Sequence, residues 1–355
     1  MTHSSDRPLR AWLGGLACLA ALALAPLVLD DAQLSLLTLV LMSAFFAQAW
    51  NLMMGFVGQL SLGHGLYAGI GAYAAALAAG SFGLSPWAGI LVGTLLSAGA
   101  GAAIAWLGFR FAVRGIYFSL LTIAFAEMAR MLFENWDFVG GNGGYFLKTP
   151  GDGALLWTLR GGTSFNYLAF LLLCAGGLAL CTVLSRSRLG YLWRAIREDE
   201  DAARAIGVPA LRLKILAVAI SAAMTSIGGS FYALLNGSLF PDTIMGMRFS
   251  IEMIVAPILG GLGTLLGPLL GALFVVPVTE FANQLAQDLG LFGLNTLVFG
   301  LLVLLVVGLL PHGLAPALAA LLQRLRPARA ATPVSVSVSV PSASGAERAA
   351  AEVRR

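Results

Sequence analysis

The sequence has 355 residues, of which 59% are hydrophobic and 11% are charged. A soluble globular domain carries about a quarter charged residues and needs a polar surface that this composition cannot supply. Uncharged stretches of about 20 residues indicate helices that span a lipid membrane. In such a protein the net charge of +4 does not indicate a nucleic-acid partner.

The first apolar run covers residues 11–29 and follows Arg7 and Arg10. This pattern is also typical of a signal peptide, with Ala-Leu-Ala before Pro26 as the possible cleavage site. Because more apolar runs follow at once, we favour an uncleaved first membrane helix.

Apolar runs of spanning length continue along the chain. They are continuous, which favours helices over the alternating strands of a membrane barrel. We expect an all-α polytopic membrane protein with about ten transmembrane helices, and counts of eight or nine stay open because two connections are apolar. Pro257 and Pro277 should kink their helices. The ten predicted spans are 11–29, 34–54, 66–80, 86–108, 115–133, 165–184, 213–235, 249–266, 268–285 and 292–310.

Basic residues gather in alternate connections, and such residues favour the cytoplasmic side of a membrane. This bias predicts a multi-pass membrane protein with its N-terminus and C-terminus in the cytoplasm. The exceptions among the 21 Lys and Arg residues are Arg130, Lys148, Arg160 and Arg248. Residues 1–322 would form the transmembrane domain, with 134–162 as an external loop. Residues 323–355 are rich in Ala, Ser and Pro and should form a disordered cytoplasmic tail.

Two connections, 55–65 and 260–267, are rich in glycine and contain hydroxyl residues. Broken backbone at membrane depth persists where it is buried in protein or lines a wet cavity, and transporters place such breaks near their substrate. Tight turns or close helix packing would explain the glycines equally well. The residues expected to line a substrate pathway are Gln59, Ser61, His64, Gly261 and Thr264.

The segment 185–214 is the longest charged run between predicted spans. We expect one amphipathic helix from about Tyr191 to Ile206, ended by Gly207 and followed by Pro209. A basic helix would suit anchoring to anionic membrane lipid, but four successive acidic residues over 198–201 favour docking against another protein.

Few ionisable residues lie inside the predicted spans. Glu127 and Arg130 are three residues apart, and Arg248 and Glu252 are four apart, so each pair can form an ion pair on one helix face. We therefore expect a structural role for both pairs. The cysteines lie in apolar runs and resemble small buried hydrophobic residues rather than disulfides or metal ligands.

One motif in the charged segment resembles a known signature. Asp201-Ala202-Ala203-x-x-x-Gly207 is similar to Glu-Ala-Ala-x-x-x-Gly, which marks the cytoplasmic coupling helix of ATP-binding-cassette (ABC) importer permeases. Asp replaces Glu here, and no Ile-x-Leu-Pro follows. Further segments, in matching order from about residue 51 to 313, resemble the branched-chain amino-acid permease family, most closely its LivM type. They are GQLSLGH at 58–64, RGIYF at 114–118, AE at 126–127, RAIRED at 194–199, GGLGT at 260–264 and HG at 312–313.

This resemblance implies a type II-like ABC importer permease for branched-chain amino acids. The implied partners are a second permease of the LivH type, two cytoplasmic ATPases that bind ATP and Mg, and a periplasmic amino-acid-binding protein. The implied coupling residues are Arg197, Glu198, Asp201, Ala202, Ala203 and Gly207.

The chain itself contains no Gly-x-x-x-x-Gly-Lys-Ser/Thr phosphate loop, no catalytic set and no metal-ligand spacing. We therefore expect a transporter subunit that is not an enzyme and holds no cofactor or metal. An ABC importer of urea or short amides stays open as an alternative, and a stand-alone channel, a secondary transporter or an intramembrane enzyme is less favoured.

Overall fold

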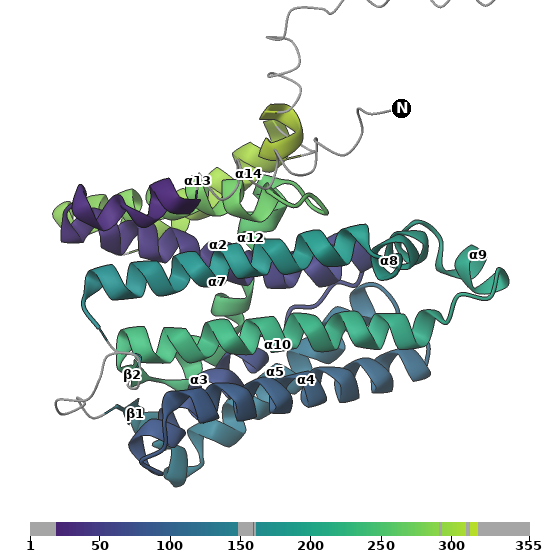
Figure 1. Ribbon diagram of the computed structural model, residues 1–355, viewed down its shortest axis with the longest axis horizontal. Coiled ribbons are helices and arrows are strands. Elements are labelled where there is room, and N and C mark those ends of the chain that lie inside the picture. Colours follow the sequence, from purple (N-terminus) through teal and green to yellow (C-terminus); the bar gives the residue numbers. More distant parts are fainter. Residues whose placement is uncertain (1–18, 148–158, 160, 291–292, 310–312, 319–355) are drawn as a thin grey trace, which may run out of the picture. The chain divides into compact units, whose positions relative to one another are not determined.

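The computed structural model describes residues 19–147, 159, 161–290, 293–309 and 313–318, which form mainly α-helices (Figure 1). Residues 11–18 of the first expected span, part of the expected external loop, the His312 of the family motif and the expected tail lie outside the described residues. A short 3₁₀ helix, η1 (Ala25–Leu27), precedes the first long helix.

Seven helical stretches among the described residues are long and apolar enough to cross a membrane, judged by length and composition. Helices α3 (His64–Gly80) and α14 (Leu294–Leu309) are shorter, with 17 and 16 residues. The expected count of about ten is therefore not confirmed. The seven stretches are α2 (Asp31–Val57), α4 (Pro86–Arg110), α5 (Ile116–Glu134), α7 (Thr163–Arg186), α10 (Ala210–Asn236), α11 with α12 (Pro241–Met245 and Met247–Gly260), and α13 (Gly267–Asp288).

The predicted span 249–266 is wrong at both ends. The helical stretch begins earlier, at Pro241, and Gly246 divides it into α11 and α12. It ends at Gly260 because the next residue, Gly261, has a φ of 120°, a conformation that only glycine adopts without strain. Pro257 and Pro277 lie inside α12 and α13, as predicted.

A small sheet is the exception to the all-α expectation. Strand β1 (Tyr145–Phe146) pairs antiparallel with β2 (Ser238–Leu239), with Tyr145 opposite Leu239. Two short 3₁₀ helices, η2 (Asp137–Val139) and η3 (Gly141–Gly143), lead from α5 to β1. The part of the expected external loop that contains β1 therefore pairs with the connection between α10 and α11.

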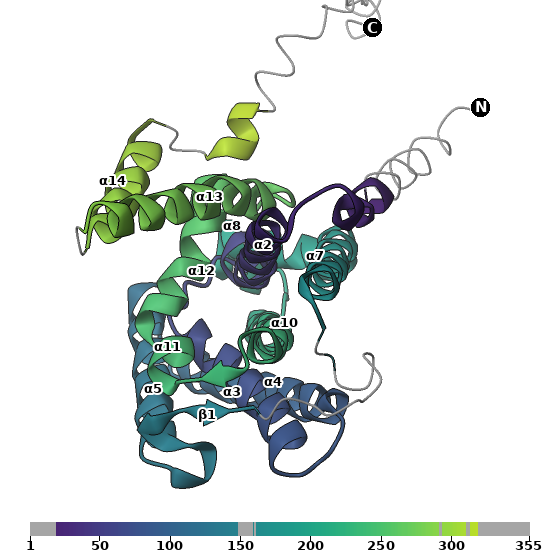
Figure 2. The same ribbon diagram turned by 90° about the vertical axis from the view of Figure 1, so that its left-hand side faces the viewer.

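Helix α10 is the centre of the helical part. It packs against α3 and α4 on one side and α2 on the other, while α11 and α12 cross from the α3–α5 group to α13 and α14 (Figure 2). Small residues bring α3 and α10 together: Ser230 Oγ donates to the carbonyl of Gly71 at 2.9 Å, and a Cβ at Gly229 would overlap the backbone of Ala68. Such contacts are typical of helix packing in membranes.

We expect Gly229→Leu to destabilise the subunit by about 1–3 kcal/mol, the usual cost of overpacking a tight contact. The measurement is thermal unfolding of the detergent-solubilised subunit, followed by size-exclusion chromatography. Gly99→Leu on α4 is the matched control, because a Cβ at Gly99 would meet nothing within 4 Å. Equal melting temperatures for the two variants would contradict the close α3–α10 contact.

Candidate functional site

The charged segment between α7 and α10 forms two short helices, α8 (Arg188–Glu198) and α9 (Glu200–Ala205). The prediction of one continuous helix from Tyr191 to Ile206 is therefore wrong. Asp199 adopts an extended conformation between them, and its carboxylate accepts hydrogen bonds from the backbone N–H groups of Asp201 and Ala202, both at 2.9 Å. Aspartate is a favoured N-cap, so it begins a new helix instead of continuing the old one.

Helix α8 is anchored in the membrane-spanning helices. Trp193 is fully buried, and its Nε1 donates to the carbonyl of Leu213 at 3.0 Å. Ile196 and Ala203 are buried in the same cluster. The partners in that cluster come from three helices: Leu52 and Phe56 of α2, Cys181 of α7, and Leu213 and Ala217 of α10. The segment is thus packed against α2, α7 and α10 together.

The acidic run has roles within the chain. Both carboxylate oxygens of Asp201 accept from Arg114, in the α4–α5 connection, at 3.2 Å. Hydrogen bonding and charge from Arg114 lower the pKa of the Asp201 carboxyl. Glu200 pairs with Arg204, as its four-residue spacing predicts, and with Lys214 Nζ at 3.1 Å. Asp199 caps α9. Three of the four acidic residues therefore have partners within this chain: Asp199, Glu200 and Asp201.

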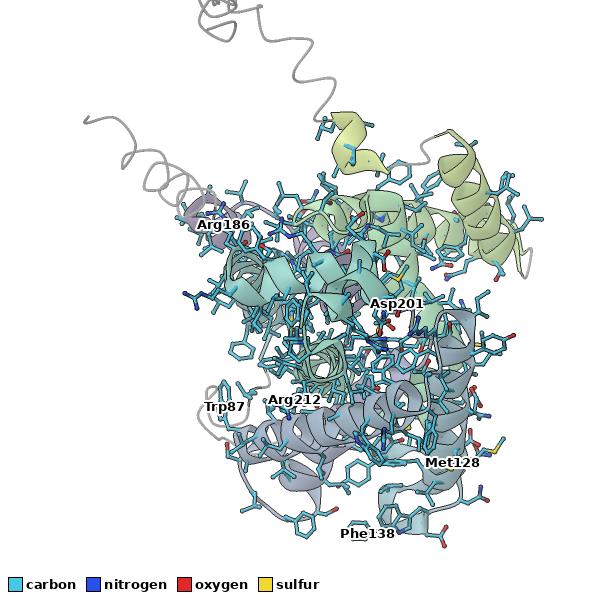
Figure 3. All side chains as sticks on the ribbon, turned by 90° about the vertical axis from the view of Figure 1, so that its right-hand side faces the viewer. Trp87, Met128, Phe138, Arg186, Asp201 and Arg212 are labelled. Atoms are coloured by element: carbon cyan, nitrogen blue, oxygen red, sulfur yellow. The ribbon has the colours of Figure 1, made fainter. Side chains whose placement is uncertain are left out.

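The expected coupling residues fall into two groups. Ala203 is buried, so its methyl group packs inside this chain. Arg197, Glu198, Asp201, Ala202 and Gly207 are exposed, and Gly207 has the positive φ expected just beyond a helix end. Ile206, at the end of α9, is an apolar side chain that is 80% exposed. Figure 3 looks onto this end of the molecule, where Arg186, Asp201 and Arg212 are labelled.

The first predicted helix break, within 55–65, occupies residues 58–63 between α2 and α3. The chain reverses at Gly58, which has a φ of 74°, and runs back beside the end of α2, where Trp50 Nε1 donates to the carbonyl of Ser61 at 2.8 Å. The buried His64 then begins α3, and its Nε2 lies 2.9 Å from Ser221 Oγ of α10.

Three backbone amides at this break donate to side chains of the same chain. The Leu62 amide donates to Thr122 Oγ1 at 3.2 Å, and the Gly65 amide donates to Ser250 Oγ at 2.9 Å. Ser61 is buried, and its Oγ accepts from the Gly63 amide. Gln59 is half-buried, and its side chain donates to the carbonyl of Val57. These contacts fix the start of α3 among α2, α5, α10 and α12.

The second break, residues 261–266 between α12 and α13, lies against the end of α2. Asn51 of α2 connects to it twice: its Nδ2 donates to the carbonyl of Thr264 at 3.0 Å, and its Oδ1 accepts from the Gly263 amide at 2.9 Å. Thr264 Oγ1 also accepts from the Gly267 amide at 3.0 Å and donates to the carbonyl of Gly261. The donor and the acceptor of the Asn51 side-chain amide therefore both hold the second break in place.

Arg197 of α8 joins the charged segment to both breaks. Its guanidinium donates to the carbonyl of Gly55, just before the first break. A Cβ on Gly58 would lie 3.2 Å from Arg197 Cγ, and one on Gly263 would touch the guanidinium. The two breaks, about 200 residues apart in sequence, thus meet at one arginine of the segment.

Sequence reasoning missed Asn51, Trp193, Lys214 and Ser250. Asn51 and Ser250 are polar residues inside apolar predicted spans, and this is a usable signal, because buried polar groups need partners. The expected role of Gln59, Ser61, His64, Gly261 and Thr264 in a substrate pathway stays a prediction. The predicted ion pairs are confirmed: Arg130 contacts Glu127 at 2.8 Å, and Arg248 contacts Glu252 at 3.1 Å.

We expect Asn51→Ala to destabilise the subunit by about 2 kcal/mol, because two hydrogen bonds of about 1 kcal/mol each are lost. Asn51→Asp keeps the acceptor for the Gly263 amide, but it turns a carboxylate oxygen toward the Thr264 carbonyl at a buried position, where an unpaired charge is costly. Both variants should therefore melt at a lower temperature than the wild type when the purified subunit is heated. Unchanged melting in both variants would show that the second break does not depend on Asn51.

Long apolar helices, buried polar helix breaks and an amphipathic connecting segment define this chain as a polytopic helical membrane protein. A family model described as the permease component of branched-chain amino acid transport systems matches residues 33–307. The chain belongs to this family. The match extends from α2 into α14 and includes both breaks and the charged segment.

Individual relatives agree with this assignment. The high-affinity branched-chain amino acid transport system permease protein LivM of Escherichia coli is 29% identical over 324 residues, which cover 85% of this chain and 74% of that protein. LivM of Salmonella typhimurium is 28% identical, over 82% of this chain and 72% of that protein. A probable LivM of Methanocaldococcus jannaschii is 26% identical, over 56% of this chain and 60% of that protein. No solved structure shows a significant match.

Proposed function

We propose that this chain is the LivM-type permease subunit of an ATP-driven importer of branched-chain amino acids in the bacterial inner membrane. Its partners would be a second permease of the LivH type, two cytoplasmic ATPases that bind ATP and Mg, and a periplasmic amino-acid-binding protein. Both termini would lie in the cytoplasm. Membership of the permease family supports this proposal.

The observation that carries the proposal is the two-helix segment α8–α9. It presents exposed residues at the end of the helical part and is anchored into α2, α7 and α10 by Trp193 and Ile196. A surface that receives force from an ATPase needs both properties: an exposed face for the partner and a rigid connection to the spanning helices.

In this proposal, the ATPases bind the exposed face of α8–α9. Nucleotide-driven movement of the segment is passed through the buried cluster to the spanning helices and through Arg197 to the two helix breaks. The breaks change position together because Arg197 contacts both and Asn51 holds the second one. The substrate path formed with the second permease then opens alternately to the two sides of the membrane.

The test is reconstitution of the chain with its candidate partners into liposomes. We expect uptake of radiolabelled leucine that requires both ATP and the binding protein, with no uptake by the chain alone. Uptake of urea or acetamide in place of leucine would favour the amide importer, and ATP-independent flux through the chain alone would favour a channel or a secondary transporter. Either result would overturn the proposal.

A further inference from the structure

A second feature of the molecule is the ion pair of Arg248 and Glu252, which lies at membrane depth and is not covered by the rest of the chain. Ser221, the partner of His64, is the twelfth residue of α10, so it lies about 16 Å along a helix of about 40 Å. The amide of Gly65, next to His64, bonds Ser250 of α12. Arg248 and Glu252 are two residues on either side of Ser250. Their backbone therefore lies near the middle of the span.

The two charged side chains are far more exposed than this depth allows in lipid. Their side chains are 78% and 52% exposed, although Arg248 Nε donates to Glu252 Oε1 at 3.1 Å. Charged groups facing the centre of a bilayer cost several kcal/mol, and such residues normally face protein or a water-filled path. The face of α12 that carries them is therefore not a lipid face.

A cavity of about 560 Å³ adjoins this ion pair, between α2, α12, α13 and α14. This volume falls in the range of small-molecule sites. Its polar groups include Glu280, Thr279 and Asn283 of α13, with the Asn283 amide 3.4 Å from Glu280 Oε1. Its apolar wall includes Ile251, Val275, Val276 and Phe299.

We propose that this cavity is a binding site for a branched aliphatic amino acid on its way through the importer, an inference that rests on the proposed function. The bond to Glu252 uses only the Nε–H of Arg248, and a guanidinium has four further N–H donors that suit a carboxylate. Glu280 takes the ammonium group, and the branched side chain packs on Val275 and Val276. Opposite charges beside an apolar wall match a zwitterion with a hydrocarbon side chain.

The first test separates this role of Arg248 from ion pairing alone. Arg248→Gln should lower leucine uptake by the reconstituted importer by about tenfold or more, the loss expected for a charged hydrogen bond. The double variant Arg248→Gln/Glu252→Gln removes both charges, so no unpaired carboxylate remains. It should stay equally defective if Arg248 binds the substrate. Recovery of uptake in the double variant would reduce Arg248 to a structural partner and overturn the proposal.

The second test reports binding without transport. Thr279→Cys, in an importer whose native cysteines are replaced by alanine, should react with a water-soluble thiol reagent, and millimolar leucine should slow this reaction, whereas glutamate should not. Arg248→Gln should remove the protection. Leu84→Cys, in the α3–α4 connection, is the control whose reaction leucine leaves unchanged.

The outcomes distinguish the two proposals. If the wild-type importer takes up no leucine, the proposed function fails. If it takes up leucine but Thr279→Cys is unprotected, or is unreactive because the second permease covers it, the function stands and the cavity is not an amino-acid site.

Discussion

Ile206→Glu is expected to reduce leucine uptake about a hundredfold, equivalent to about 2.8 kcal/mol, the loss typical of a central interface residue. Ile206 lies at the end of α9 and is 80% exposed, whereas the buried cluster under the segment does not include it. A charge at this position should therefore disturb a partner and leave the subunit's own packing intact. The measurements are co-purification of the ATPases and uptake in liposomes, together with the melting temperature of the subunit.

Two further variants define what this result means. Ile206→Val keeps an apolar side chain and should retain uptake. Ala203→Asp should lower the melting temperature of the subunit itself, because Ala203 is buried and an unpaired charge would be placed among apolar residues. Normal ATPase binding by Ile206→Glu would exclude the end of α9 from the docking surface.

Arg197→Ala is expected to separate ATP hydrolysis from transport. The side chain contacts the carbonyl of Gly55 and lies against Gly58 and Gly263, so its removal takes away a polar contact of α8 with both helix breaks. Uptake should fall by about tenfold or more, since a charged hydrogen bond contributes about 1.5–3 kcal/mol. The ATPases should still co-purify, because the exposed face of α9 is unchanged.

The control for this prediction is Arg197→Lys, which keeps the charge but replaces the planar fork with a single ammonium group. It should give intermediate uptake per ATP hydrolysed. A full loss of ATPase binding in Arg197→Ala would assign this residue to the docking surface. Wild-type uptake in the same variant would show that the contact with Gly55 carries no movement.

The sequence predicts the long helices well because twenty apolar residues in a row have few other structures available in lipid. The predicted spans 86–108, 115–133 and 165–184 agree with α4, α5 and α7 within about two residues. The glycine-rich breaks were also predictable in position. The number of spans was not predictable, because hydropathy alone does not distinguish the shorter apolar helices α3 and α14 from full spans.

The candidate site was predictable only in its local parts. The four-residue spacing indicates the pairing of Glu200 with Arg204, and Asp199 is a recognisable helix cap. The meeting of the two breaks at Arg197 is different, because it depends on how helices far apart in sequence pack, and spacing along the chain carries no such information. The same holds for the contact of Asp201 with Arg114.

The burial of Trp193 has a mechanical consequence for the subunit. Bending of the segment should not absorb a push on α8, because Trp193 lies in a buried cluster with residues of α2, α7 and α10 and its indole donates to the carbonyl of Leu213. The three helices α2, α7 and α10 should therefore tilt together as one rigid body, and any sliding between helices should occur in other parts of the subunit. Spin labels on α7 and α10 should keep a constant separation during turnover. A separation that varies with the nucleotide state would show that these helices do not move as a rigid body.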